Sequence, residues 1–134
     1  MIRGIGLDLA DIDRIERLLG RHPERARVRL FTAGERAYCD RRAQPARHFA
    51  ARFAAKEAAY KALAGTAEAR HIHWQDIEVV NEPLDGRPTL VLHGLAAKRA
   101  DELGVSFIHV TLTHSDLVAA AMVVLESASA TPSP

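Results

Sequence analysis

The feature that most constrains the fold is an alanine-rich stretch in the middle of the 134-residue chain, FAARFAAKEAAYKALAG, residues 49–65. Its residues are mostly strong helix formers, so it predicts a helix over residues 46–64 that ends at Gly65. At about 100° per residue, one half of this helix carries the charged and aromatic side chains Phe49, Arg52, Phe53, Lys56, Glu57, Tyr60 and Lys61. The other half is nearly bare, with Ala51, Ala54, Ala55, Ala58 and Ala62. Another backbone can therefore approach the alanine half closely.

The N-terminal residues 2–9 alternate in the manner of a β-strand. One face of this strand carries Ile5, Leu7 and Leu9, and the other carries Gly4, Gly6 and Asp8. The two glycines leave the second face without side chains just ahead of Asp8. A bare strand face and a bare helix face complement each other, so we expect them to pack together and to bring Asp8 towards Glu57.

The remaining pattern predicts a single α+β domain over residues 1–126, in which a small antiparallel sheet packs against the long central helix and shorter helices. Asp11 or Asp13 can cap a helix that ends at Gly20 and Pro23, and Thr32 and Glu35 form a capping box that starts another. Further elements are predicted as strands 77–81 and 89–93, a helix 95–103, and strands 107–113 and 118–126. Residues 127–134 are expected to be a disordered tail.

Composition points to a globular cytoplasmic protein. Hydrophobic residues make up 48% of the chain and charged residues 26%, and no apolar run approaches the roughly 18 residues of a membrane span. The first residues lack the pattern of a signal peptide. The single Cys39 cannot form an internal disulfide, which fits a reducing cytosol.

Charge is distributed unevenly along the chain. Residues 1–61 hold fourteen Lys or Arg against eight Asp or Glu, whereas residues 62–134 hold four against nine. A stripe of arginines, Arg14, Arg17, Arg21 and Arg25, lies on and just after the first predicted helix. Nucleic-acid binding would call for aromatic residues among them, and this segment has none. A solvated helix face is the simpler interpretation of such a stripe, and if the arginines bind a partner, an acidic protein suits them better than nucleic acid.

Two carboxylates are expected in buried surroundings, Asp8 on the strand and Glu57 on the helix. Buried carboxylates need cations or a metal, and a pair without a His or Cys cluster favours Mg²⁺, which leaves positions for water and substrate phosphate. Arg52, Lys56 and Lys61 supply charge for such a phosphate. The alternative is simple pairing within the helix, because Glu57 and Lys61 stand in the favourable i,i+4 order.

Three segments stand out together by their order and spacing: GIGLDLADIDRI, FAARFAAKEAAYKAL and IHVTLTHSDLVAAAMVVLE. They resemble the holo-[acyl-carrier-protein] synthases, small bacterial 4′-phosphopantetheinyl transferases. WQDIEVV with the following DGRP turn also resembles the family, so the likeness covers about residues 1–126. The resemblance implies the 4′-phosphopantetheinyl transferase fold. It also implies Mg²⁺-dependent transfer of phosphopantetheine from coenzyme A to a serine of apo acyl carrier protein, releasing adenosine 3′,5′-bisphosphate, in support of fatty acid biosynthesis.

The resemblance further implies roles for individual residues. Asp8 and Glu57 would hold the metal, Lys61 would stabilise the leaving phosphate, and Arg52, Lys56, Lys61 and His114 would bind coenzyme A. It leaves open whether Glu57 or a water on the metal accepts the serine proton. The family docks its acidic carrier on a basic first helix, which gives Arg14, Arg17, Arg21 and Arg25 a partner. It is typically a homotrimer with sites between subunits.

Gly65-Thr66-Ala67 departs from the family's Gly-Thr-Gly turn, and Tyr60 has no assigned role. Two alternative functions stay open: a non-catalytic module that binds coenzyme A or a carrier protein, and a transferase dedicated to the carrier domains of a specialised synthase.

Overall fold

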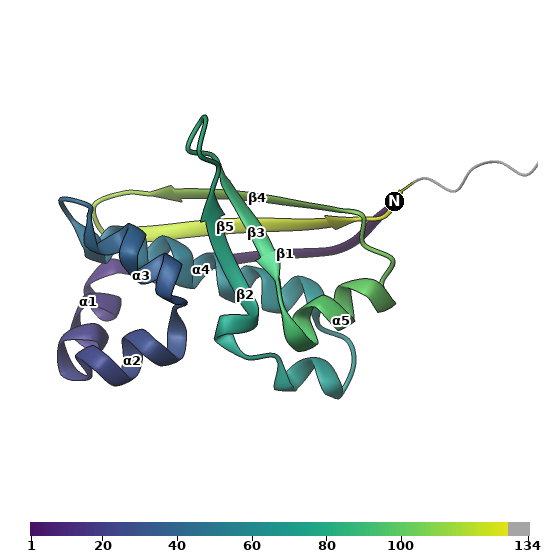
Figure 1. Cartoon of the computed structure of the whole chain (residues 1–134), viewed down its shortest axis with the longest axis horizontal. Helices are drawn as coiled ribbons and strands as arrows, with labels where there is room; N and C mark the ends of the chain where they lie inside the picture. Colours follow the sequence, from purple (N-terminus) through teal and green to yellow (C-terminus); the bar gives the residue numbers. More distant parts are fainter. Residues whose placement is uncertain (129–134) are drawn as a thin grey trace, which may run out of the picture.

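The computed structural model describes residues 1–128 and has the predicted α+β architecture (Figure 1). Its helices are α1 (Ile12–Arg21), α2 (Pro23–Leu30), α3 (Ala33–Asp40), α4 (Pro45–Leu63) and α5 (Gly94–Glu102), with the short 3₁₀ turns η1 (Glu68–His71) and η2 (Trp74–Asp76). Its strands are β1 (Ile2–Asp11), β2 (Ile77–Asn81), β3 (Pro88–Leu92), β4 (Phe107–His114) and β5 (Val118–Glu126). Among the described residues no helix is long and apolar enough to cross a membrane.

The strands form two antiparallel sheets. The larger has the order β1-β5-β4, and the smaller is the β2-β3 hairpin, which lies beside β4. Helix α4 runs along the larger sheet and packs against β1 and β5 (Figure 1). Helices α1, α2 and α3 gather at one end of the molecule and α5 lies at the other.

The predicted contact between two bare faces is confirmed. A Cβ atom added to Gly6 would lie 1.7 Å from the carbonyl oxygen of Ala58, and one added to Gly4 would lie 2.2 Å from that of Ala62. Only glycine lets strand and helix backbones come this close. The opposite face of β1 is left open, with Ile5 60%, Leu7 60% and Leu9 66% exposed.

One helix was not predicted, and the capping hydrogen bond expected at the start of α1 is absent. We read Pro23 as the end of a helix, but it is the first residue of α2, where its missing N–H costs nothing. Asp11 occupies the N-cap position of α1 without a side-chain hydrogen bond. The capping box of Thr32 and Glu35 on α3 is confirmed.

The predicted tail partly falls within the described residues. Ser127 is buried, its amide donates to the carbonyl oxygen of Met1, and its hydroxyl accepts from Arg3. It is therefore tied to the start of β1, contrary to the expectation of disorder. Residues 129–134 of that tail lie outside the described residues.

Candidate active site

The close packing of β1 on α4 places Asp8 beside Glu57, as predicted. Asp8 follows Gly6 on the inner face of β1, and its side chain is 14% exposed. Burial raises the pKa of Glu57 first, and the charge of Asp8 and a hydrogen bond with it raise that pKa further. Lys61 and Arg14 act in the opposite direction. Two carboxylates thus lie together in a half-buried position, where burial and the charge of Asp8 disfavour the ionised form of Glu57.

Lys61 provides the nearest cation to this pair. Its ammonium nitrogen lies 2.7 Å from Asp8 Oδ1 and 3.2 Å from the carbonyl oxygen of Leu7. The side chain is 52% exposed, so it stands at the rim of the site. The alternative of a simple Glu57–Lys61 pair is not what the structure has, because the close partner of Lys61 is Asp8.

The donor set fits a hard divalent cation. Asp8 and Glu57 supply two oxygen-bearing groups, and an added positive charge would offset the burial and the neighbouring Asp8 charge that raise the pKa of Glu57. Among residues 1–128 no cluster of three or more His, Cys, Asp or Glu side chains could hold a metal. The remaining ligands of a Mg²⁺ ion would therefore be water and substrate, as the sequence suggested.

A cleft lies next to Glu57, and Tyr60 is one of the residues that line it. A cavity of about 320 Å³ is lined by Glu57, Tyr60, Arg70 and Trp74, among others. A second cavity of about 530 Å³ lies over the turn at residues 64–67 and shares Tyr60 and Arg70 with the first. Tyr60 and Arg70 therefore stand between two hollows on one side of α4. Sequence reasoning missed Arg70, although its position just after the Gly65 turn was a usable signal.

Arg52 and Lys56 lie in the interior of the protein, whereas the sequence predicted that they face phosphate. Arg52 is 2% exposed, donates to Asn81 Oδ1 at 2.6 Å, and lies over the ring of Tyr38. Lys56 is fully buried and bonded to Glu35, and burial lowers its pKa against the raising effect of that carboxylate. Lys56 lines the cavity beside Glu57, but its ammonium is taken up by Glu35 and by the backbone carbonyl oxygens of Trp74 and Ile77. The expected cluster of three cations on one helix face thus reduces to Lys61.

His114 lies at the end of β4, away from the carboxylate pair. Its ring is 6.2 Å from that of His48, near the start of α4. His48 and Glu57 are nine residues apart on that helix, which is roughly 13 Å along its axis. His114 and Glu57 of one chain therefore mark two separate places.

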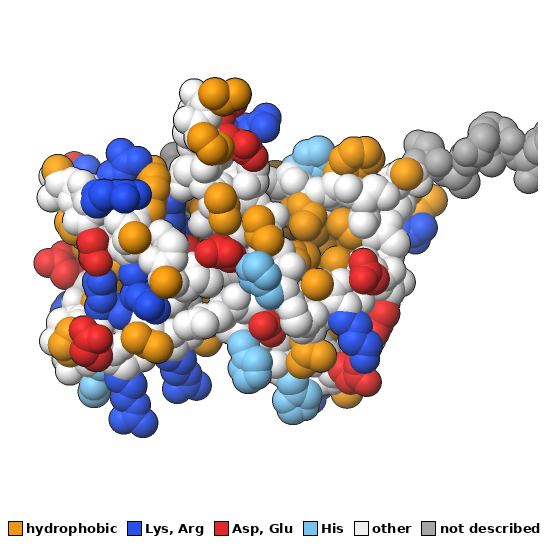
Figure 2. Space-filling view, viewed as in Figure 1, with side chains coloured by type: hydrophobic (Ala, Val, Ile, Leu, Met, Phe, Trp, Pro, Cys, Tyr) orange, Lys and Arg blue, Asp and Glu red, His pale blue; other side chains and the backbone are white. Residues whose placement is uncertain are grey.

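The four arginines predicted to bind a partner are all exposed on α1 and α2, namely Arg14, Arg17, Arg21 and Arg25. None of them forms an ion pair with a carboxylate within the part of the chain that the structure describes. Lys and Arg side chains gather at this end of the molecule (Figure 2). Arg14 is also near enough to Glu57 for its charge to oppose part of the rise in the pKa of Glu57. The basic surface thus extends to the edge of the site.

Comparison with known proteins assigns this arrangement to a family. The family model described as "4'-phosphopantetheinyl transferase superfamily" matches residues 4–121. The chain belongs to this superfamily. Members of it are transferases, so the chain is an enzyme of that class, and the fold and the family predicted from the sequence are confirmed.

Relatives of the transferase cover nearly all of it. A holo-[acyl-carrier-protein] synthase of Solibacter usitatus is 46% identical over 127 residues, which is 95% of this chain and 100% of that protein. The crystal structure of the Neisseria meningitidis synthase superimposes with a TM-score of 0.81 at 28% identity, covering 95% and 100% of the two chains. That of Bacillus anthracis, in complex with CoA (3',5'-ADP), gives 0.73 at 35% identity and covers 96% and 99%.

Proposed function

We propose that this transferase moves the 4′-phosphopantetheine group of coenzyme A onto a serine hydroxyl of an apo acyl carrier protein and releases adenosine 3′,5′-bisphosphate. The observation that carries the proposal is the carboxylate pair of Asp8 and Glu57, with Lys61 at its rim and a cleft beside it. The names of the relatives support the two substrates. Fatty acid biosynthesis in the cytoplasm is the setting we expect, and the free, buried Cys39 is compatible with it.

Asp8 and Glu57 are the residues that would hold Mg²⁺. When bound, the ion supplies positive charge that neutralises the pyrophosphate as its bond breaks. We therefore expect activity to require Mg²⁺ and both carboxylates.

The protein's own groups would position the substrates and move one proton. Glu57, or a water held beside it, accepts the proton of the attacking serine, because its carboxylate lies next to Asp8 at the edge of the cleft. Lys61, half exposed at the rim, donates a hydrogen bond to the leaving phosphate. Tyr60 and Arg70 line the adjoining hollows, where Arg70 offers its charge to the phosphates of the donor.

The carrier would dock on the basic end of the molecule. Arg14, Arg17, Arg21 and Arg25 are exposed there, and Arg14 lies near Glu57. An acidic carrier bound to these arginines would bring its serine to the site from the α1 side. Such steering raises the association rate and weakens with salt.

We also propose that three copies assemble around the open face of β1. Ile5, Leu7, Leu9 and Met122 are exposed on that sheet, and a lone chain rarely leaves such a face to water. Assembly would allow a neighbouring copy to bring its His114 to the donor, since His114 and Glu57 of one chain lie at separate places. Sedimentation equilibrium returning the mass of a single 14.7 kDa chain contradicts this proposal.

The experiment that tests the catalytic proposal compares Asp8→Asn and Glu57→Gln with the unaltered protein. Each is incubated with coenzyme A, apo carrier and Mg²⁺, and adenosine 3′,5′-bisphosphate is measured by chromatography. We expect release by the unaltered protein that chelation of Mg²⁺ abolishes, and almost none from either variant. Full release from either folded variant refutes the assignment of its carboxylate. The matched control is Asp101→Asn, an exposed carboxylate on α5, which should release the product at the normal rate.

A further inference from the structure

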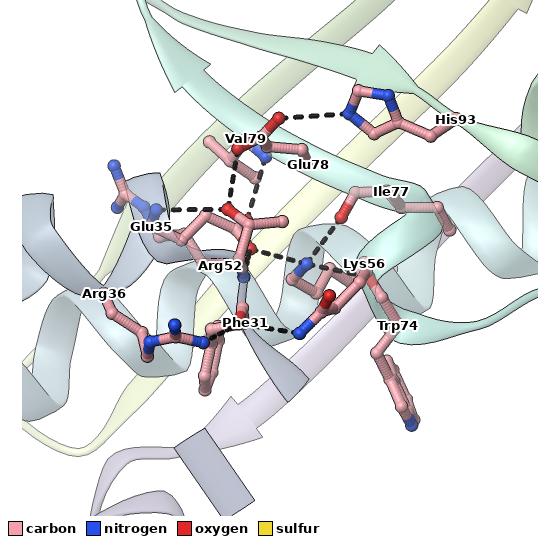
Figure 3. A network of polar contacts seen from close by, with 12 residues as sticks. Phe31, Glu35, Arg36, Arg52, Lys56, Trp74, Ile77, Glu78, Val79 and His93 are labelled. Carbon is pink, nitrogen blue, oxygen red and sulfur yellow. Dashed lines mark hydrogen bonds and ion pairs between the residues drawn. The ribbon is translucent and has the colours of Figure 1, made fainter. Parts of the chain in front are cut away.

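A buried ion pair lies directly behind the candidate active site. Lys56 Nζ is 2.7 Å from Glu35 Oε1, and both side chains have zero exposure. The same ammonium donates to the backbone carbonyl oxygens of Trp74 at 2.8 Å and Ile77 at 2.5 Å. All three of its protons are therefore used, and one side chain of α4 holds α3, η2 and β2 together (Figure 3).

Glu35 is equally occupied. It accepts hydrogen bonds from the backbone amides of Val79 in β2 and Thr32 at the N-cap of α3, both at 2.9 Å. The carboxylate and the ammonium thus fix four backbone groups, which lie on η2, on β2 and at the N-cap of α3. Lys56 is one of the residues that line the cavity beside Glu57, but its side chain has no exposed surface and its ammonium is fully hydrogen-bonded, so the pair has no group left over for substrate.

The network nevertheless reaches the cleft through the backbone that it holds. Trp74 and Ile77, whose carbonyl oxygens bind Lys56, also line the cavity beside Glu57, with Ile72 and Tyr60. Lys56 and Glu57 are adjacent on α4. The distance between Glu57 and the facing wall of the cavity therefore depends on the Lys56 ammonium.

Stability alone is a weak reason for such a pair. Two charges lose their hydration when they are buried, and replacing both by apolar residues of similar size is often neutral or stabilising. Glu35 and Lys56 do something that apolar residues cannot do, because they set the positions of the backbone groups at Trp74, Ile77 and Val79 through directional hydrogen bonds. An apolar replacement would therefore no longer hold these backbone groups in their positions.

We propose that the Glu35–Lys56 pair is a positioning device that fixes the Trp74–Ile77 wall of the cleft and thereby sets how tightly the coenzyme A donor is held. The inference rests on the proposed function, since it takes coenzyme A as the ligand of the cleft. It assigns Lys56 a place behind the donor site, in contrast to the direct phosphate contact expected from its sequence position.

The test uses Lys56→Met, Glu35→Gln and the double variant Lys56→Met/Glu35→Leu. Steady-state transfer is measured as a function of coenzyme A and, separately, of apo carrier. Displacing a wall of the cleft by a fraction of an ångström to 1 Å should raise KM for coenzyme A by at least about tenfold in Lys56→Met. KM for the carrier and kcat at saturating coenzyme A should stay within about threefold of the unaltered protein. Glu35→Gln, which keeps a polar acceptor, should give a smaller rise.

The double variant separates positioning from mere stability. We expect urea unfolding to show that it recovers most of the stability lost in Lys56→Met, because no unpaired charge is left inside. Its KM for coenzyme A should stay raised. A destabilising change elsewhere, Leu125→Ala in β5, serves as control and should leave both KM values unchanged. Trp74 is the only tryptophan, so its emission reports directly on the wall and should shift to longer wavelength in both Lys56→Met proteins.

Two results overturn the inference. One is a KM for coenzyme A that stays normal in folded Lys56→Met. If Lys56→Met does not fold, the same result in both Glu35→Gln and the double variant counts instead. The other is a double variant that recovers stability and donor affinity together. An unaltered protein that neither binds nor consumes coenzyme A refutes the proposed function, and the inference falls with it.

Discussion

Replacing Gly6 by alanine tests the packing that creates the site. The new Cβ would lie 1.7 Å from the carbonyl oxygen of Ala58 and 2.6 Å from its carbon, whereas real Cβ atoms essentially never come within 3.0 Å of another heavy atom. The obstacle is backbone, so β1 would have to retreat from α4 by more than about 1 Å. Asp8, two residues further along β1, would move with it and away from Glu57.

The cost follows from that displacement. Overpacking of this kind reduces the free energy of unfolding by about 3 kcal/mol, the upper part of the usual range. A misplacement of about 1 Å in a catalytic group lowers turnover by roughly a hundredfold. Urea unfolding followed by circular dichroism measures the first quantity, and release of adenosine 3′,5′-bisphosphate at saturating substrates measures the second.

Gly20→Ala is the matched control, because nothing lies within 4 Å of the added Cβ and the residue is inside α1. It should keep full activity and gain up to about 0.5–1 kcal/mol of stability, as alanine is the better helix former. Gly4→Ala, whose Cβ would lie 2.2 Å from the carbonyl oxygen of Ala62, should also be destabilising. The reasoning is refuted if Gly6→Ala unfolds and turns over like the unaltered protein.

Three further predictions concern charge. Arg14→Glu should raise KM for the carrier far more than KM for coenzyme A, while Lys98→Glu on α5 should change neither; equal effects of Arg14→Glu on both substrates would remove the docking surface. Without divalent cations at neutral pH, Glu57→Gln should melt at a higher temperature than the unaltered protein. The pKa of Glu57 is raised in the folded state, so above that pKa its ionised form lowers the free energy of unfolding, and glutamine removes this charge. Adding Mg²⁺ should stabilise only the unaltered protein, and equal stabilisation of both would count against a metal at Glu57. Burial raises the pKa of Glu78, but hydrogen bonds with Thr32 and His93 outweigh it and leave the pKa below its usual value. The resulting stability is present above pH 4.5 and lost as pH falls further, so the unaltered protein should lose more unfolding free energy on acidification than Glu78→Gln, and parallel losses would contradict this.

The sequence predicted those parts of the site that depend on local periodicity. Strand alternation put Gly6 and Asp8 on one face, helical spacing put the alanines of α4 opposite its charges, and the absence of side chains on both faces indicated their contact. That contact brought Asp8 to Glu57. The strand pattern and the helix pattern behind this prediction each lie within one short segment of the sequence.

The burial of Arg52 and Lys56 could not be predicted from local periodicity in the same way. Whether a helix face meets solvent or another part of the chain depends on segments distant in sequence, here Glu35 on α3 and Trp74 to Val79 before and within β2. Helix α2 was missed for a different reason. Its few buried residues, Ala26 and Leu30, give a faint apolar pattern, and Pro23 suits either the end or the start of a helix.

The most direct test of the central claim is the intact mass of an apo acyl carrier protein after incubation with this protein, coenzyme A and Mg²⁺. We predict an increase equal to one phosphopantetheine group, located on a serine, in the complete mixture only. Omission of coenzyme A or chelation of Mg²⁺ should leave the carrier mass unchanged. An unmodified mass for several different apo carriers in the complete mixture would contradict the proposed transferase activity on carrier proteins.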